Sequence, residues 1–386
     1  MDKGIAKGRT FMRRATSVTT AIVLLAVYSL TEAASADGKK LLQEMIEGAR
    51  KEGQLDVMIT SSAGEKGGRE LTTAFKRRFG LESLNISPDL SGQESQKFNR
   101  AVAEAKSGIP PTFDLMQGEA ANVLSLMDVG GAERLENWQA VLAEAVPEAF
   151  KIKEKVSPET LAGWGFLWST RTVALLYNPK LISEGDLPKT WKQKGDPKYR
   201  GAFSMPPWIS ALLMGILKYD KNEWLEIVRA LGRNKRQVFT YDAAAQRMLL
   251  GDLKFFYGNA DIYFDQKLRD PSAPIEETFL EDLTTMRQVL YVVRKGAKHP
   301  NAAKLFALWA TSAEANEIFE RHAYIENLVL SKGPISQKIA NVLKDRNIKV
   351  WSWFDNPETV AKFQWFESSE GKEYAKLVAR AQKDGK

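Results

Sequence analysis

Four aromatic side chains lie at or near expected strand ends and helix starts, which are the positions that line a crevice in α/β proteins. With two carboxylates they form a box suited to a cation. With an arginine and two helix starts they form a site suited to a carboxylate or a phosphonate. The sequence leaves both signs of solute charge open. The aromatic residues are Trp168, Trp208, Tyr241 and Phe264, the carboxylates are Glu119 and Asp261, the arginine is Arg171 with its strand neighbour Thr170, and the helix starts are at Ser62 and Ser210.

A small polar loop, Ser61 to Gly64, follows the first strand expected in the chain, at residues 55–60. Free backbone N–H groups and hydroxyls at the carboxyl end of such a strand point into the crevice of an open α/β sheet. Ser61 and Ser62 are therefore candidate ligand contacts. An ordinary capped helix start gives the same pattern.

The order of strand and helix repeats and predicts a first lobe. Strands are expected at 84–86 and 113–116, and helices at 93–107 and 120–127. Three strands that alternate with helices predict a parallel sheet with right-handed crossovers. Glu119 follows the third strand and is expected on the same lobe as Ser61 and Ser62.

An aromatic run rich in β-formers, residues 163–177, is expected to carry the chain into a second lobe. Further strands are expected at 201–205, 237–240 and 254–257, and the chain returns through a strand at 290–296. A chain that leaves one lobe and returns to it crosses between the lobes at least twice, so the pair can hinge. The expected parts are 37–165 for the first lobe, 166–270 for the second, 271–330 for the return to the first, and 331–386 for C-terminal helices packed on the lobes.

Residues 1–36 have the pattern of a cleaved signal peptide. A basic start precedes an apolar stretch at 21–30 and the small residues Ala34, Ser35 and Ala36. The apolar stretch is near ten residues, and a spanning helix needs about 20. The chain has no cysteine, so neither a lipid anchor nor a disulfide is available. We expect a periplasmic protein that begins at Asp37 and has no lipid anchor.

The charge balance argues against a nucleic-acid partner. Five bases and two acids lie in residues 1–36, so their removal lowers the net charge from +7 to +4. The remaining bases form no dense block, which is typical of a mixed-charge surface.

Motifs for catalysis and for cofactors are missing from the sequence. There is no Gly-x-Ser-x-Gly elbow, no Gly-rich nucleotide loop and no cysteine metal site, and both histidines, His299 and His322, lie in the return segment. We therefore expect no enzyme, no catalytic residue, no cofactor and no bound metal. A periplasmic hydrolase with Glu119 and Asp261 as paired carboxylates is the alternative from another class.

Several phrases, in order along the chain, resemble the extracellular solute-binding proteins of ABC importers, in the branch that includes ferric-iron, polyamine, thiamine and phosphonate receptors. They span nearly the whole mature chain. The phrases are Lys51-Glu52-Gly53, Leu175-Leu176-Tyr177-Asn178-Pro179-Lys180, Leu187-Pro188-Lys189-Thr190-Trp191, Asp196-Pro197-Lys198-Tyr199-Arg200-Gly201 and the run from Lys295 to Phe306.

This resemblance implies an α/β type II periplasmic-binding-protein fold with two hinged lobes, each a βα sandwich. It implies a monomer that closes on a small polar solute and docks transiently on an ABC permease of the inner membrane. We expect the solute to be organic and charged.

Ferric iron is the alternative solute that the resemblance raises. In ferric receptors of this branch a His after the first strand, a Glu after the third and a pair of Tyr after an Asn-containing loop hold the metal. Glu119 matches the Glu, but Ser61 and Ser62 replace the His, and Ala260 and Asp261 follow Asn259 where the Tyr pair is expected. The expected ligand contacts are Ser61, Ser62, Glu119, Trp168, Thr170, Arg171, Trp208, Ser210, Tyr241, Asn259, Asp261 and Tyr263.

Overall fold

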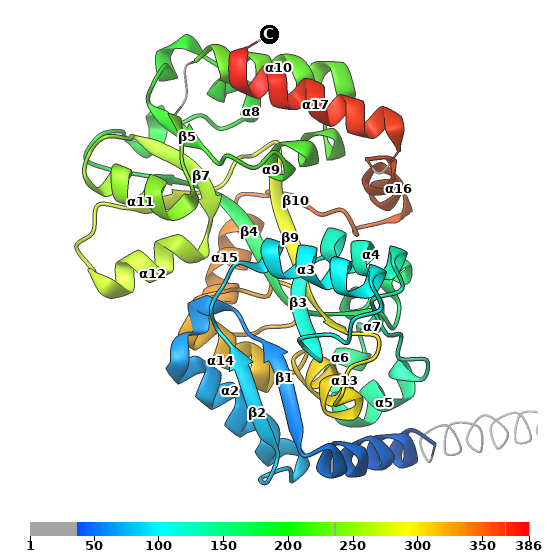
Figure 1. Ribbon diagram of the computed structural model, residues 1–386. Coiled ribbons are helices and arrows are strands. Elements are labelled where there is room, and N and C mark those ends of the chain that lie inside the picture. The colour runs from blue at the N-terminus through cyan, green and yellow to red at the C-terminus, as the bar shows by residue number, and fades with distance from the viewer. Residues whose placement is uncertain (1–36, 235–236, 367, 386) are drawn as a thin grey trace, which may run out of the picture.

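A computed structural model describes residues 37–234, 237–366 and 368–385 of the chain, which fold into two lobes (Figure 1). The predicted signal peptide lies outside these residues. Among the described residues, no helix is both long and apolar enough to cross a membrane.

The lower lobe in Figure 1 is built on a sheet in the order β2-β1-β3-β9-β4. β1 (Gln54–Met58) pairs in parallel with β2 (Asn85–Asp89) and β3 (Leu115–Glu119), as the alternating pattern predicts. Neighbouring residues of a strand face opposite sides: Val57 packs in one core of this lobe and Met58 in the other. Helices therefore cover both faces of the sheet. They are residues 37–52, α2 (Gly64–Phe79), α3 (Glu94–Lys106), α4 (Ala120–Asp128), α5 (Trp138–Ala145), α6 (Pro147–Phe150), α7 (Lys153–Val156), α13 (Pro300–Trp309) and α14 (Ala313–Ala323).

The upper lobe repeats this plan with a sheet in the order β4-β7-β5-β6. Its strands are β5 (Phe203–Met205), β6 (Gln237–Val238), β7 (Phe255–Asn259) and β8 (Glu276–Thr278), the last of which pairs with β4. Leu175 and Leu176 of β4 again pack in two separate cores. The helices of this lobe are α8 (Trp191–Lys194), α9 (Ser210–Leu213), α10 (Lys221–Arg233), α11 (Tyr241–Leu249), α12 (Asp261–Arg269), α15 (Pro334–Asp345), α16 (Pro357–Trp365) and α17 (Ser369–Asp384).

Two long antiparallel strands belong to both lobes. β4 (Gly165–Tyr177) pairs with β9 (Thr284–Val293) over its first half and with β7 over its second half. β9 pairs with β3 at one end and with β10 (Val350–Trp351) at the other. The strand predicted at 290–296 thus begins six residues earlier, at Thr284, and ends at Val293. The predicted two-lobed α/β fold is confirmed, with β4 and β9 as its crossings.

Candidate functional site

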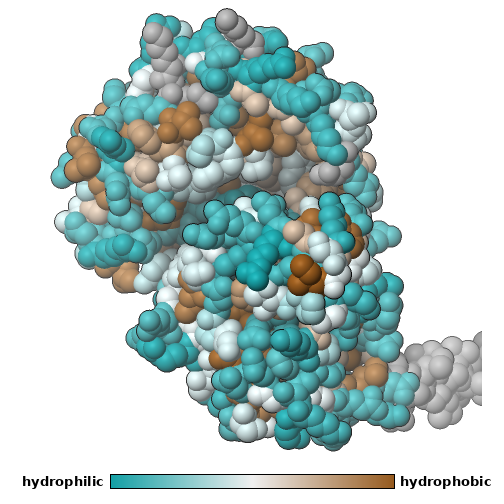
Figure 2. All heavy atoms as spheres, viewed as in Figure 1, coloured by the Kyte–Doolittle hydropathy of each residue, from teal (hydrophilic) through white to brown (hydrophobic). Residues whose placement is uncertain are grey.

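The space between the lobes contains one cavity lined by seven of the twelve expected ligand contacts. It encloses about 1010 Å³, part of it open to solvent, and Figure 2 shows a hollow between the two halves of the molecule. The seven residues are Ser61, Ser62, Glu119, Arg171, Trp208, Tyr241 and Asn259, and the cavity is completed by Thr60, residues 92–96, Arg287 and Val289.

These residues meet because the carboxyl ends of parallel strands lie at the same edge of a sheet. Ser61 and Ser62 lie between β1 and α2, Glu94 begins α3 after β2, and Glu119 ends β3 immediately before α4. On the other lobe Asn259 ends β7, and Tyr241 begins α11. The cavity therefore receives helix N-termini, whose free N–H groups favour negative charge, from both lobes.

Two arginines form the floor of the cavity, one on each crossing strand. Arg171 of β4 lies directly opposite Arg287 of β9, and both side chains are 18% exposed. Like charges at opposite positions of paired strands destabilise a sheet. Their positive charge is partly balanced by two carboxylates: Arg171 Nη1 lies 3.3 Å from Asp261 Oδ2, and Arg287 Nη1 lies 2.6 Å from Glu119 Oε1.

Several buried polar atoms in the lining of this cavity or directly behind it lack a hydrogen-bond partner within the described part of the chain. They are Nε of Arg287, Oδ1 of Asp261 and the hydroxyl of Tyr241. Buried polar groups are almost always paired, because leaving one unpaired costs about 1–3 kcal/mol. Unused hydrogen-bonding capacity beside an open cavity is typical of a site that a ligand completes.

Two of the acidic groups near the arginines have raised pKa values. Burial raises the pKa of Asp261, although Arg171 and Arg287 oppose the shift. Burial also raises the pKa of Glu94, which accepts a hydrogen bond from Gln117 at 3.1 Å. A raised pKa favours the neutral carboxyl group. In both groups burial opposes the charged form, while Arg171 and Arg287 favour it.

One wall of the cavity is aromatic. The rings of Trp208 and Tyr241 meet edge to face with centroids 4.8 Å apart. Both residues line the cavity, so their remaining surface is available to the organic part of a ligand.

The structure places the other five expected contacts elsewhere. Trp168 does not form a cavity wall: it is fully buried in the core of the first lobe, 4.2 Å from Phe319 between ring centroids. Thr170 is also fully buried, and its backbone N–H donates to the Glu326 carbonyl oxygen. Adjacent residues of a strand face opposite sides, so Thr170 cannot share the cavity with Arg171.

Asp261, Ser210 and Tyr263 also lie outside the cavity lining. Asp261 lies behind it, paired with Arg171, and Ser210 lines a neighbouring pocket. Tyr263 packs in a core of the second lobe with Lys338 Nζ 4.3 Å from its ring centroid. Tyr263 is two residues into helix α12, and this turn carries its ring away from the cavity.

Sequence reasoning missed Arg287 and Glu94. The β-branched and apolar residues Thr284, Thr285, Met286 and Val289 extend the return strand toward its start, and this extension includes Arg287. The polar residues 91–93 follow the second strand as Ser61 and Ser62 follow the first, and this parallel points to Glu94.

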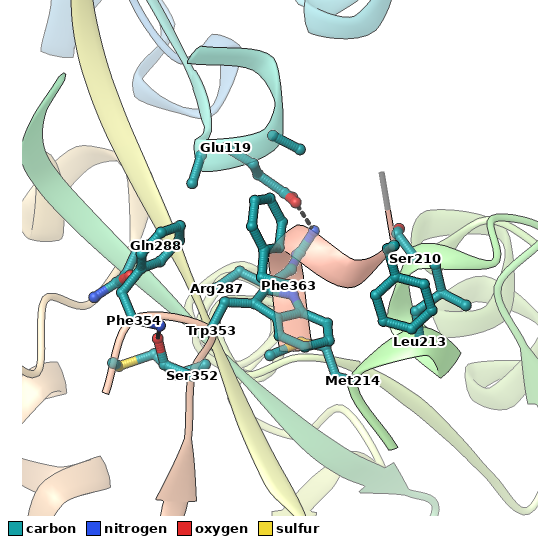
Figure 3. A pocket seen from close by; sticks show the side chains of 14 residues that line it. Glu119, Ser210, Leu213, Met214, Arg287, Gln288, Ser352, Trp353, Phe354 and Phe363 are labelled. Carbon is teal, nitrogen blue, oxygen red and sulfur yellow. Dashed lines mark hydrogen bonds and ion pairs between the residues drawn. The ribbon is translucent and has the colours of Figure 1, made fainter. Parts of the chain in front are cut away.

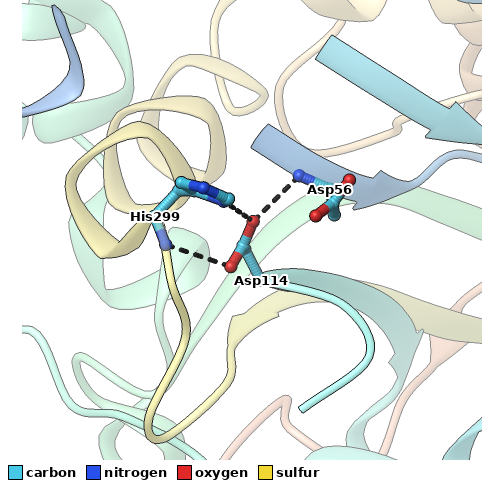
Figure 4. A group of neighbouring side chains, drawn as sticks. All are labelled: Asp56, Asp114 and His299. Atoms are coloured by element: carbon cyan, nitrogen blue, oxygen red, sulfur yellow. Dashed lines mark hydrogen bonds and ion pairs between the residues drawn. The ribbon is translucent and has the colours of Figure 1, made fainter. Parts of the chain in front are cut away.

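A cluster of His and Asp residues with metal-like spacing lies outside the cavity. Within the described ranges it is the one group of three or more His, Cys, Asp or Glu residues of this kind: Asp56, Asp114 and His299 (Figure 4). The Asp114 carboxylate accepts hydrogen bonds from the backbone N–H groups of Asp56 and His299, and its Oδ2 lies 2.7 Å from His299 Nδ1. These contacts join β1, the start of β3 and the start of α13, which explains the cluster as a structural one.

Comparison with known proteins identifies the family of the chain. The model of the family described as bacterial extracellular solute-binding protein matches residues 70–324. No curated protein matches the chain.

Solved structures with the same fold include iron-bound HitA from Pseudomonas aeruginosa, with a TM-score of 0.62 and 20% identity over 85% of this chain and 99% of that chain. AfuA from Actinobacillus pleuropneumoniae, with fructose-6-phosphate bound, has a TM-score of 0.59 and 16% identity, covering 86% of this chain and 98% of that chain. The Atu4243-GABA receptor has a TM-score of 0.58 and 16% identity, covering 83% of this chain and 97% of that chain. The ligands named for these proteins differ in chemistry, and at these identities the likeness shows the fold alone.

Proposed function

Because the chain belongs to the family of bacterial extracellular solute-binding proteins, and so binds a solute for an ABC transporter, we propose that its solute is an organic anion held by Arg171 and Arg287. The observation that supports this proposal most directly is the pairing of the two arginines across β4 and β9, at the floor of the cavity. Guanidinium groups bind carboxylates and phosphates through parallel N–H donors.

The surroundings of the two arginines support an anionic head group. The loop at Ser61 and Ser62 supplies hydroxyls and N–H groups from one lobe, and Asn259 supplies an amide from the other. Trp208 and Tyr241 supply apolar surface for the organic part of the solute.

A ferric ion is less compatible with this cavity. A trivalent cation requires several anionic oxygen ligands, whereas here the Glu119 carboxylate is paired with Arg287 and Tyr263 packs in a core away from the cavity. The positive charges of Arg171 and Arg287 would also repel a polycation, such as a polyamine. The anion is therefore the solute class that the site supports best.

The crossing strands supply the mechanism of capture in this proposal. The two lobes move as units about β4 and β9, and closure brings the loops of both lobes onto the solute and excludes water, which strengthens the polar contacts. The closed monomer then docks on its permease at the inner membrane, in the periplasm.

A thermal-shift screen tests the proposed solute class. The panel contains organic phosphates, mono- and dicarboxylates, polyamines and ferric iron. We expect stabilisation by an organic anion, about 2.7 kcal/mol at a ligand concentration of 100 Kd, and its loss in Arg171→Met. The matched control is Arg247→Met, which removes a 54% exposed arginine paired with Asp252. Stabilisation by a polyamine or by iron, retained in Arg171→Met, would contradict the proposal.

A further inference from the structure

A second chamber adjoins the cavity between the lobes (Figure 3). Its empty space amounts to about 720 Å³, part of it open to solvent, and its lining is mostly apolar. Leu213 and Met214 contribute from the upper lobe, Ala120 and Ala121 from the start of α4 in the lower lobe, and Trp353 and Phe363 from the C-terminal segment.

The aromatic wall of this chamber is preformed. The ring centroids of Trp353 and Phe363 lie 5.6 Å apart, and those of Phe354 and Phe363 lie 5.5 Å apart. None of these three side chains is fully buried. Large apolar rings that hold one another in place, yet leave surface uncovered in a concave site, are suited to an apolar ligand group.

The chamber and the solute cavity share the same two residues, Glu119 and Arg287. Figure 3 shows the carboxylate of Glu119 directed at the Arg287 guanidinium beside the ring of Phe363. Arg287 therefore faces polar loops on one side and aromatic rings on the other. A molecule whose anionic group contacts Arg287 has its substituent within reach of the chamber.

The aromatic wall comes from a part of the chain beyond the family match. Trp353, Phe354 and Phe363 follow the last matched residue, Tyr324. β10 pairs with β9 immediately before Trp353, which fixes the segment beside the crossing strands. The aromatic wall of the chamber thus lies outside the matched region, whereas Ala120, Ala121, Leu213 and Met214 lie within it.

We propose that the solute is an amphipathic anion, with a carboxylate at Arg287 and an aromatic or branched apolar substituent in the chamber lined by Met214, Trp353, Phe354 and Phe363. This inference rests on the proposed function and narrows the solute class. A small polar acid leaves the chamber unused, whereas an arylalkanoate fills it and removes apolar surface from water.

Two probes of this class test the inference on the full mature chain. One is 1-anilinonaphthalene-8-sulfonate, an aromatic anion whose fluorescence rises in an apolar site, and the other is 3-phenylpropanoate, compared with acetate by calorimetry. We expect one anilinonaphthalenesulfonate per chain, and 3-phenylpropanoate binding at least tenfold tighter than acetate.

Variants of the chamber give the second arm of the test. Ala121→Trp places a ring in the chamber from an exposed helix position, and Ala103→Trp places the same ring on exposed α3, which lines neither cavity. We expect Ala121→Trp to weaken both aromatic probes at least tenfold and to leave acetate within twofold. Ala103→Trp should leave all three within twofold.

The outcomes separate this inference from the proposed function. No binding of either aromatic probe, or equal binding by the Ala121→Trp and wild-type proteins, overturns the inference. If Arg287→Met weakens both probes while Ala121→Trp changes neither, the inference fails and the anion site stands. If neither variant changes either probe, both fail.

Discussion

Arg287 and Arg294 lie seven residues apart, the first on β9 and the second just after it, and each pairs with a glutamate, yet their environments differ. Arg294 is 1% exposed and uses all three nitrogens: Nε to the Gly131 carbonyl, Nη1 to Glu104 at 3.1 Å and Nη2 to the Ala101 carbonyl. Arg287 pairs with Glu119 and Asn259, its Nε has no partner among the described residues, and it borders two cavities.

We interpret this difference as one between a structural arginine and the arginine that we propose binds the solute. The contacts of Arg294 join β9 to α3 and to the loop after α4, each guanidinium nitrogen has a protein partner, and the side chain borders neither cavity. Arg287 keeps a buried donor unused beside open space, which carries a cost to stability that a ligand can offset. Substitution of Arg294 should therefore lower the free energy of unfolding and leave solute affinity unchanged, whereas substitution of Arg287 should lower solute affinity and leave the free energy of unfolding nearly unchanged.

The largest expected effect is on stability at Arg294. Arg294→Met takes from the Glu104 carboxylate its buried guanidinium and leaves it the exposed Arg100, whose Nε lies 3.0 Å from Glu104 Oε1. Breaking a buried pair costs about 3–5 kcal/mol, and the remaining Arg100 contact places the expected loss at the lower end, about 3 kcal/mol. Urea unfolding measures the loss. Solute affinity per folded molecule should stay within twofold, and weaker binding at unchanged stability would reverse the assignment of the two arginines.

The next effect is on affinity at Arg287. Arg287→Met should weaken solute binding about 100-fold, or about 2.7 kcal/mol, because it removes a charged donor from the floor of the site. The free energy of unfolding should change by less than about 1 kcal/mol, since Glu119 is 37% exposed and regains water. Calorimetry and urea unfolding on the same preparation check both numbers. Arg287→Lys, which keeps the charge but not the fork of donors, should recover part of the affinity.

The acids of the two regions should differ in the sign of their pH dependence. Burial raises the pKa of Glu104, but hydrogen bonds from Thr112 and Arg294 outweigh it and lower the pKa overall. Its contribution to stability is present above about pH 4.5 and is lost as the pH falls through the lowered pKa. Behind the solute cavity, burial and then Asp261 raise the pKa of Glu326 to about 7. The contribution of protonated Glu326 to the free energy of unfolding is fully present below about pH 4.5 and is lost as the pH rises toward 7.

Glu326→Gln tests this sign directly. Glu326 accepts a hydrogen bond from the Thr172 backbone N–H on β4, and a glutamine oxygen can accept the same bond. We expect the variant to match wild type near pH 4.5 and to exceed it by about 3 kcal/mol at pH 8. Glu104→Gln is the opposite case and should be less stable than wild type at pH 7, with a difference that shrinks below pH 4. A variant Glu326→Gln that is less stable at pH 8 than at pH 4.5, relative to wild type, would contradict the account.

The smallest effect is expected at the polar loop of the first lobe. Ser62→Ala removes one exposed hydroxyl from the cavity edge, and a single neutral hydrogen bond contributes about 1 kcal/mol. Affinity should fall about fivefold, with no change in unfolding. Ser125→Ala, whose hydroxyl bonds the Ala121 carbonyl on α4, is the matched control and should leave affinity unchanged.

The sequence could predict the parts of the site that follow strand ends. Ser61, Ser62 and Glu119 could be expected in one place because each lies at the carboxyl end of a strand of the first lobe's parallel set, and this rule needs no knowledge of distant contacts. Asn259 was expected opposite them from the resemblance. The two-lobed fold followed from the same order of strands and helices, together with the resemblance.

The floor of the site depends on contacts that are distant in sequence. Arg171 and Arg287 meet through the register of β4 on β9, which is shifted between Leu167 and Ser169. The irregularity at Trp168 could not be read from an alternating pattern, so its ring was expected in the cavity and instead packs in the core. The apolar chamber depends on where the C-terminal segment crosses β9, and local patterns carry no information on that crossing.

Native mass spectrometry of the protein purified from the periplasm without refolding tests the central claim most directly. The account predicts that wild type retains an organic molecule of negative charge, and that the double variant Arg171→Met/Arg287→Met, purified in the same way, retains none. A metal ion or a polycation retained equally by both proteins would contradict it.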